Sequence, residues 1–214
     1  MPESAGPPCE AATWVVDTGV FVACGRQENA KYTALERFTR KHSGAFVIPQ
    51  RVYEELGGAA NQSTPGQTPI DSAISAEWVT VADEIEYTDS TVSAVMDDVR
   101  RYIASASNRS EDRIEKTDTA LAAVAAQRLS SGDASFVYIV TTDTAAGEGT
   151  VSVLETYGFD DQIAFIDGFE VNYPCLLAAF GGSLRQGLPA STTRFADTTA
   201  VSAGSAVSTG VPSE

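Results

Sequence analysis

Histidine and cysteine are scarce in this chain, which has one histidine and three cysteines among 214 residues. With His42 alone and no C-x-x-C pair, we expect no zinc site. A Ser-His-Asp or Cys-His nucleophile system would also depend on His42, which follows a helical pattern and is interpreted as a solvated helix-end residue. The scattered cysteines, Cys9, Cys24 and Cys175, indicate a reducing interior and not a disulfide framework.

Long apolar runs are also missing. No run reaches the roughly 18 residues that a membrane-spanning helix needs, and the N-terminal MPESAGPPCEAA has neither a basic start nor the apolar stretch of a signal peptide. We therefore expect a soluble, cytoplasmic protein. Large apolar residues are rare in the Ser-, Thr-, Ala- and Gly-rich segment 186–214, which predicts a disordered tail. With a disordered segment at 1–12, one folded domain at 13–185 remains.

Positive charge is the third shortage. The chain has 14 basic and 29 acidic residues, a net charge of −15, and its only lysines are Lys31, Lys41 and Lys116. Such a surface repels nucleic acid at low salt. The same lysine-poor composition is typical of salt-accumulating halophiles, whose cytoplasm screens charges over a short Debye length. We therefore interpret the negative charge as a haloarchaeal-like adaptation to a salty cytoplasm and not as evidence about the binding partner.

Short apolar runs alternate with helical patterns along the chain. Runs without polar alternation predict strands at 14–16, 46–48, 78–81, 136–142 and 163–166. Helical spacing predicts helices at 20–24, 30–41, 49–56, 91–104, 110–127, 144–158 and 168–180. The breaker-rich segment 57–68 predicts a flexible loop, either a substrate-contacting loop or a surface insertion. The alternation predicts an α/β fold, a three-layer α/β/α sandwich around a central, mainly parallel sheet.

Two acids, Asp17 and Asp143, directly follow predicted strands. Ligands of parallel α/β sheets bind beyond the carboxyl ends of the strands, so both acids are candidate site residues. For Asp17 there is a simpler alternative, in which its side chain caps the helix that begins in TGVFVAC.

Two further acids lie on predicted helices. At 100° per residue, Glu55 lies about 80° from the apolar stripe of its helix, whereas Glu54 points nearly opposite, so only Glu55 can face the sheet edge. Asp118 lies at the centre of the apolar stripe of the helix expected at 110–127. The alternatives for Asp118 are a buried salt bridge, or a helix cap if that helix begins near Thr117.

Four carboxylates that converge on one patch need a cation. Oxygen ligands at a partly open site favour Mg²⁺ or Mn²⁺. An ion held in this way can activate water and stabilise the leaving oxygen of a phosphodiester, so the pattern indicates phosphodiester hydrolysis.

The motifs that carry these acids, VVDTGVF, PQRVYEEL, EKTDTALAAVA and VTTD, resemble in order and context those of the PIN-domain nucleases. The resemblance covers nearly all of the predicted domain. It implies that the catalytic, metal-binding acids are Asp17, Glu55, Asp118 and Asp143, with Thr141 of the T-x-D element as a hydrogen-bonding support.

The resemblance also implies a function. It is that of a Mg²⁺- or Mn²⁺-dependent endoribonuclease, a VapC-like toxin or an RNA-processing nuclease, with RNA as substrate, an antitoxin-like protein partner and a homodimeric state. The alternative is a non-catalytic PIN-like domain that binds proteins. The archaeal ribosomal-RNA maturation nucleases of this family add a zinc ribbon, which this chain lacks. The basic residues near the motifs are Arg51, Arg100, Arg101, Arg109 and Arg113.

Two other acidic α/β classes fit less well. Phosphoacceptor receiver domains and haloacid-dehalogenase-like phosphatases need a lysine after a late strand, and no lysine follows Lys116. The phosphatases also carry a second aspartate where this chain has Gly19.

Overall fold

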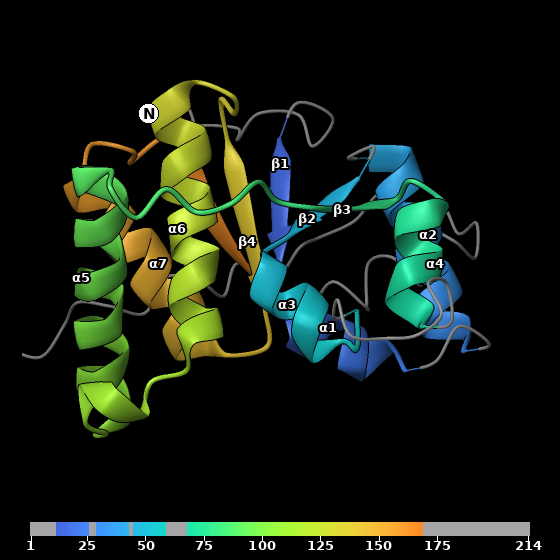
Figure 1. The fold of residues 1–214 in the computed structure, drawn as a ribbon, viewed down its shortest axis with the longest axis horizontal. Helices are drawn as coiled ribbons and strands as arrows, with labels where there is room; N and C mark the ends of the chain where they lie inside the picture. The colour runs from blue at the N-terminus through green and yellow to red at the C-terminus, as the bar shows by residue number, and fades with distance from the viewer. Residues whose placement is uncertain (1–11, 26–28, 43–44, 59–67, 169–214) are drawn as a thin grey trace, which may run out of the picture. The chain divides into compact units, whose positions relative to one another are not determined.

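A computed structural model of the chain describes residues 12–25, 29–42, 45–58 and 68–168 (Figure 1). They all belong to one compact unit, Met1–Gly182. Apart from Ala12 and Gly168, the segments expected to be disordered, 1–12 and 186–214, and the helix expected at 168–180 lie outside the described residues. Most of the loop expected at 57–68 lies outside them too.

Five parallel strands form one sheet in the order β3-β2-β1-β4-β5. The strands are β1 (Thr13–Val16), β2 (Phe46–Ile48), β3 (Val79–Val81), β4 (Val137–Thr141) and β5 (Ile163–Asp167). Neighbouring β1 and β4 pair with Val16 opposite Val140, so both strands end at the same edge of the sheet. The expected parallel sheet is confirmed.

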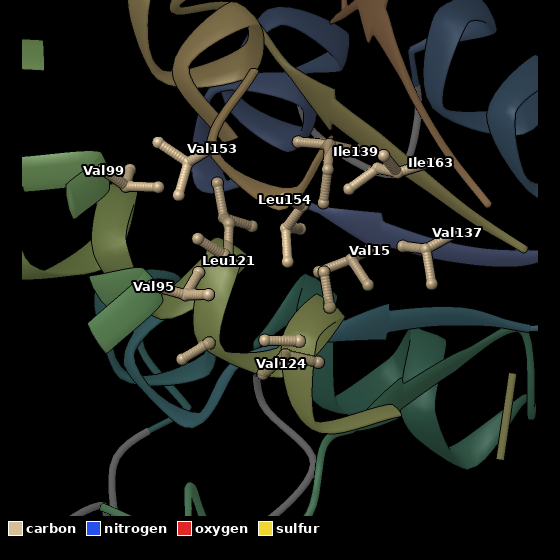
Figure 2. Packing of buried hydrophobic residues seen from close by; sticks show 14 of the residues in the cluster. Val15, Val95, Val99, Leu121, Val124, Val137, Ile139, Val153, Leu154 and Ile163 are labelled. Carbon is tan, nitrogen blue, oxygen red and sulfur yellow. The ribbon is translucent and has the colours of Figure 1, made fainter. Parts of the chain in front are cut away.

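Helices cover both faces of this sheet, and each face has its own apolar core. Successive strand residues point to opposite faces. Val15 therefore packs with α5, α6 and α7 in one cluster, and Figure 2 shows it near Leu154. Trp14 and Val16 lie in a second cluster with α1, α2, α3 and α4. Two cores on either side of one sheet confirm the three-layer α/β/α sandwich.

The seven α-helices among the described residues follow the predicted alternation, with two differences. Their bounds are α1 (Thr18–Cys24), α2 (Ala30–His42), α3 (Gln50–Glu55), α4 (Pro69–Ser75), α5 (Ser90–Ser107), α6 (Lys116–Ser131) and α7 (Thr144–Thr156).

The start of α6 corrects the helix expected at 110–127. A short 3-10 turn, Glu111–Arg113, comes first, and Ile114 and Glu115 are then extended, with ψ angles of 132° and 140°. A continuous helix cannot pass through extended residues, so α6 begins at Lys116.

Helix α4 was not predicted from the sequence. It begins with a capping box, in which the Thr68 hydroxyl accepts from the Asp71 amide and the Asp71 carboxylate accepts from the Thr68 amide. Pro69 fits the first helical turn because its missing N–H would have had no partner there.

Candidate active site

Asp17 occupies the first turn of chain after β1, where the sheet ends. Its amide donates to the Val140 carbonyl at 2.9 Å, so the residue extends the pairing with β4. The residue is 9% exposed, and its side chain accepts from the Gly19 amide at 3.4 Å. A side chain at Gly19 would collide with Thr142, whose Oγ1 would lie 2.1 Å from the added Cβ. The hydrogen bond from the Gly19 amide makes Asp17 the N-cap of α1, as the simpler alternative held. Asp17 also lies at the carboxyl edge of the sheet.

Burial raises the pKa of Asp17 above its usual value, because the charged carboxylate loses solvation. Hydrogen bonds from Thr141 and from the amides of Thr18 and Gly19 oppose this shift, and the nearby charge of Glu55 adds to it. The carboxyl of Asp17 is thus held at the edge with less hydration than an exposed acid.

The T-x-D element joins Asp17 to Asp143. Buried Thr141 donates from Oγ1 to Oδ2 of Asp17 at 3.0 Å, and its Oγ1 accepts from the Asp143 amide at 3.1 Å. Asp143 in turn accepts at Oδ1 from the Ala146 amide at 3.1 Å and caps α7. The predicted hydrogen-bonding contact of Thr141 is therefore present, and it fixes both strand-end acids relative to each other.

Glu55 ends α3 and turns toward the same edge. Its Oε2 accepts from the Thr18 hydroxyl at 2.5 Å, and its Oε1 accepts from the Thr117 hydroxyl. Glu54 faces away and accepts from the side chain of Gln50 at 3.3 Å. The helical geometry therefore separates the two acids as the sequence indicated.

Thr18 and Thr117 were not among the predicted site residues. Each stands next to a predicted acid in the sequence, Thr18 after Asp17 and Thr117 before Asp118. A hydroxyl beside an acid on the same edge is the signal that could have identified them, because such hydroxyls can bind the neighbouring carboxylate.

Asp118 lies in the first turn of α6, three residues after the N-cap Glu115. It is therefore not the N-cap itself, and that alternative was wrong. Within the part of the chain that the structure describes, no ion pair includes Asp118, so the salt-bridge alternative has no support there. The charges that act on its carboxyl come mainly from other acids.

The pKa of Asp118 is raised to about 7, first by burial and then by the charges of Asp143, Asp17 and Glu115. Arg109 opposes the shift. Like charges raise the pKa of an acid only when they are close to it. Hydrogen bonds place the start of α6 at the same edge, because Thr117 beside Asp118 donates to Glu55, and Glu55 also accepts from Thr18 beside Asp17.

These acids are not arranged as a ready ligand set. Among the described residues, no three Asp, Glu, His or Cys side chains form a group that could hold a metal ion. The hydrogen bonds explain this, because oxygens of Glu55, Asp17 and Asp143 face hydroxyl and amide donors. The donor chemistry still suits a hard cation, since only oxygen atoms converge and the like charges raise the pKa of Asp118.

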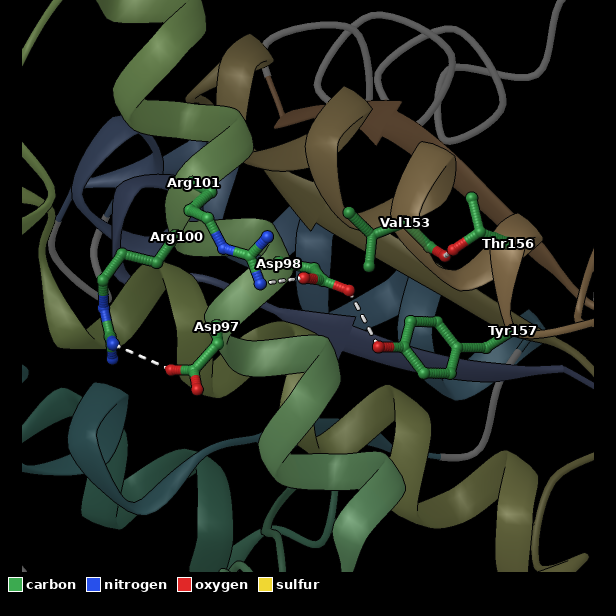
Figure 3. A network of polar contacts seen from close by, with 7 residues as sticks. All are labelled: Asp97, Asp98, Arg100, Arg101, Val153, Thr156 and Tyr157. Atoms are coloured by element: carbon green, nitrogen blue, oxygen red, sulfur yellow. Dashed lines mark hydrogen bonds and ion pairs between the residues drawn. The ribbon is translucent and has the colours of Figure 1, made fainter.

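Two of the candidate arginines are engaged on α5. Arg100 pairs with Asp97 at 3.0 Å, and Arg101 pairs with Asp98, which also accepts from the Tyr157 hydroxyl at 2.8 Å (Figure 3). These pairs lie within one helix and its contact to α7. Of the remaining candidates, Arg109 acts on the acids by its charge, which lowers the pKa of Asp118.

Comparison with known families identifies the class of this fold. The family model of the Halobacterial PIN domain matches residues 10–173. The chain therefore belongs to the Halobacterial PIN domain family, and its fold is that of a nuclease family. Neither the curated proteins nor the solved structures gave a match. No helix in the described ranges is long and apolar enough to cross a membrane.

Proposed function

We propose that this protein is a metal-dependent endoribonuclease that hydrolyses RNA phosphodiester bonds at the carboxyl edge of the sheet. The observation that carries the proposal is the pKa of Asp118, raised to about 7 by burial and by Asp143 and Asp17. Three partly buried acids from separate segments are costly for the apo protein, because their charges repel and lose solvation. Acids whose pKa is raised by burial and by like charges, at the expense of stability, are typical of functional sites.

Each acid has a role in this proposal. Asp17, Glu55, Asp118 and Asp143 would hold Mg²⁺ or Mn²⁺, the cations that prefer carboxylate oxygens. When bound, the ion would activate a water molecule and stabilise the leaving oxygen. Thr141 orients Asp17 through its 3.0 Å hydrogen bond, and the hydrogen bond from the Thr18 hydroxyl would keep Glu55 within reach of the ion.

The hydrogen-bonded partners of the acids give the non-catalytic alternative a specific basis. Asp17 and Asp143 cap helices, and both oxygens of Glu55 accept from threonine hydroxyls. On this alternative the acids hold the fold together and the domain binds proteins. Asp118 argues against it, because it gains no capping bond and has a destabilising environment.

The biological setting belongs to the same proposal. A cytoplasmic VapC-like toxin would have a small antitoxin encoded beside it, whereas an RNA-processing nuclease would not. Copurification of the protein with the product of an adjacent small gene tests the first setting, and the oligomeric state in solution tests the expected homodimer.

The proposed activity is tested with purified protein and labelled single-stranded RNA. Cleavage in Mn²⁺ or Mg²⁺ that stops on addition of a chelator supports the endoribonuclease. The reaction should be run in molar potassium chloride, because screening then reduces repulsion between RNA and a chain with a net charge of −15. Absence of cleavage on several RNAs with either ion would favour the non-catalytic alternative.

A further inference from the structure

A cavity of about 430 Å³ lies between α3, α6 and the segment that joins β3 to α5. Figure 1 shows this segment passing in front of α6 on its way to α5. The residues that matter for its chemistry are Arg51, Glu54, Asp83, Glu84, Tyr87 and Ala120. The cavity is therefore formed by α3 and α6, the two helices that also carry Glu55 and Asp118, and Glu54 lines it from the side of α3 that is turned away from Glu55.

The outer wall of the cavity is held in place by hydrogen bonds. The side-chain amide of Gln127 on α6 donates to the Glu84 carbonyl at 3.2 Å and accepts from the Glu86 amide at 2.9 Å. Ser93 donates to the Tyr87 carbonyl at 2.6 Å. A wall fixed at three backbone groups forms the cavity before a ligand arrives, and preformed sites lose less entropy on binding.

Tyr87 presents an aromatic surface at this cavity. It is 56% exposed, and it is one of two large exposed hydrophobic residues in the described ranges. Exposed aromatic rings serve single-stranded nucleic acids as stacking platforms. The position of Tyr87 therefore points to a flat ligand.

The charges around the cavity decide which flat ligand fits. Glu54, Asp83 and Glu84 supply carboxylates and only Arg51 supplies a positive charge, so a phosphate is repelled from the interior. Carboxylates accept hydrogen bonds and cannot donate them, so the group that enters must carry N–H donors. Arg51 is exposed and has no ion pair with any described residue, which leaves it able to contact a phosphate outside the cavity.

We propose that this cavity binds a guanine base of single-stranded RNA next to the cleaved phosphodiester, an inference that rests on the proposed endoribonuclease function. The Watson–Crick edge of guanine has two adjacent N–H donor groups, which match the two oxygens of one carboxylate, whereas uracil has one. Tyr87 stacks on the base, and Arg51 contacts the RNA backbone. Gln127 is a positioning residue for the wall.

Binding of short labelled uridine oligomers without divalent ions tests this inference, in potassium chloride at high concentration. One oligomer is all uridine, and the others carry a single central guanosine, adenosine or cytidine. We expect the guanosine oligomer to bind about tenfold more tightly than the all-uridine oligomer, the scale of one stacked and hydrogen-bonded base. Equal affinities of the four oligomers would overturn the proposal.

Substitutions of the cavity residues test whether the guanosine oligomer binds in this cavity. Tyr87→Leu should weaken guanosine-oligomer binding about tenfold, and Tyr87→Phe should leave it within about twofold because the ring remains. Asp83→Asn with Glu84→Gln should remove the guanosine preference. Arg51→Met should weaken every oligomer, whereas the matched Arg101→Met, on α5 and paired with Asp98, should not. Thermal unfolding of each variant establishes that it folds.

Two outcomes separate this inference from the proposed function. Guanosine binding that depends on Tyr87, in a protein that cleaves no RNA, would support the base site and contradict the nuclease. Cleavage with a KM unchanged by Tyr87→Leu would support the nuclease and overturn the base site. Displacement of the oligomer by an arginine-rich peptide, with no guanosine preference, would overturn it in favour of a basic protein partner.

Discussion

Thr141 donates its hydroxyl proton to Oδ2 of Asp17 at 3.0 Å, although 124 residues separate the two in the chain. This bond joins the ends of neighbouring strands β1 and β4 at the edge where the acids gather. It also lowers the pKa of Asp17 against the stronger effect of burial. One buried hydroxyl therefore helps to keep a partly desolvated carboxylate charged and in position.

Replacement of this hydroxyl should affect both stability and metal affinity. Thr141→Val keeps the shape but leaves the Asp17 carboxylate and the Asp143 amide without their bonds to Oγ1. We expect a loss of about 1–3 kcal/mol in the free energy of unfolding and weaker Mn²⁺ binding. Urea unfolding and Mn²⁺ titration measure the two effects. Thr80→Val is the control, because Thr80 is an exposed residue of β3 whose hydroxyl donates, among the described residues, only to the Phe46 carbonyl at 3.4 Å. Equal losses in both variants would contradict the prediction.

Asp118 should make the stability of the apo protein depend on pH. Its pKa is raised in the folded state from 3.8 to about 7, so the folded protein binds the proton more tightly than the unfolded chain does. The stabilisation is complete below about pH 4 and is lost as the pH rises through 7. The shift in the pKa of Asp118 corresponds to a change of at most about 4 kcal/mol in the free energy of unfolding.

The Asp118→Asn variant isolates this effect. It cannot ionise, so in a chelator its stability should fall less than that of the wild type between pH 4 and 8, and it should be the more stable protein above pH 7. Urea midpoints at a series of pH values measure this. Parallel pH profiles for the two proteins would show that Asp118 is not the group responsible.

Mn²⁺ or Mg²⁺ should raise the unfolding temperature of the wild type, because an ion bound only by the folded state stabilises it. The increase should be larger at pH 8 than at pH 6, since the ion competes with the proton on Asp118. Asp118→Asn should show a smaller increase at both values. Differential scanning calorimetry measures it, and an equal increase in the variant would contradict a ligand role for Asp118.

Glu55 and Thr117 should separate metal binding from structural support. Thr117→Val removes one hydrogen bond to Glu55 and should cost about 1 kcal/mol of stability, with cleavage largely retained. Glu55→Gln removes a negative charge from the proposed ion site and should lower Mn²⁺ affinity more than stability. Comparison of unfolding free energy and Mn²⁺ affinity for both variants checks this; a purely structural loss in Glu55→Gln would favour the non-catalytic alternative.

The sequence predicted the sheet well because its central strands β1, β2 and β4 are buried on both faces and so read as nearly continuous apolar runs. Trp14 and Val15 enter opposite cores, and both positions are apolar. The start of α6 was misjudged because Ile114 fits the helical stripe although its backbone is extended. The helix α4 was missed because its signal is a capping box after Thr68 and not a long periodic pattern.

The acids of the site could be predicted because two follow strands and two have a definite helical phase. Their hydrogen bonds could not. The contact of Glu55 with Thr117 spans 62 positions and depends on how α3 meets α6 and on side-chain rotamers. No local pattern contains that information, which arises from packing of the whole domain.

The central claim is that Asp17 serves chemistry as well as the cap of α1, and Asp17→Asn tests it most directly. Asparagine caps a helix as well as aspartate does, so the fold should persist, but one negative charge is lost from the proposed ion site. The matched control is Asp160→Asn, which removes the same charge from an exposed position before β5, at the opposite edge of the sheet.

The deciding measurement is the rate of Mn²⁺-dependent cleavage of labelled single-stranded RNA in molar potassium chloride by the wild type and these two variants. The account predicts wild-type cleavage for Asp160→Asn and loss of cleavage for a folded Asp17→Asn. Cleavage by Asp17→Asn at the wild-type rate would contradict it.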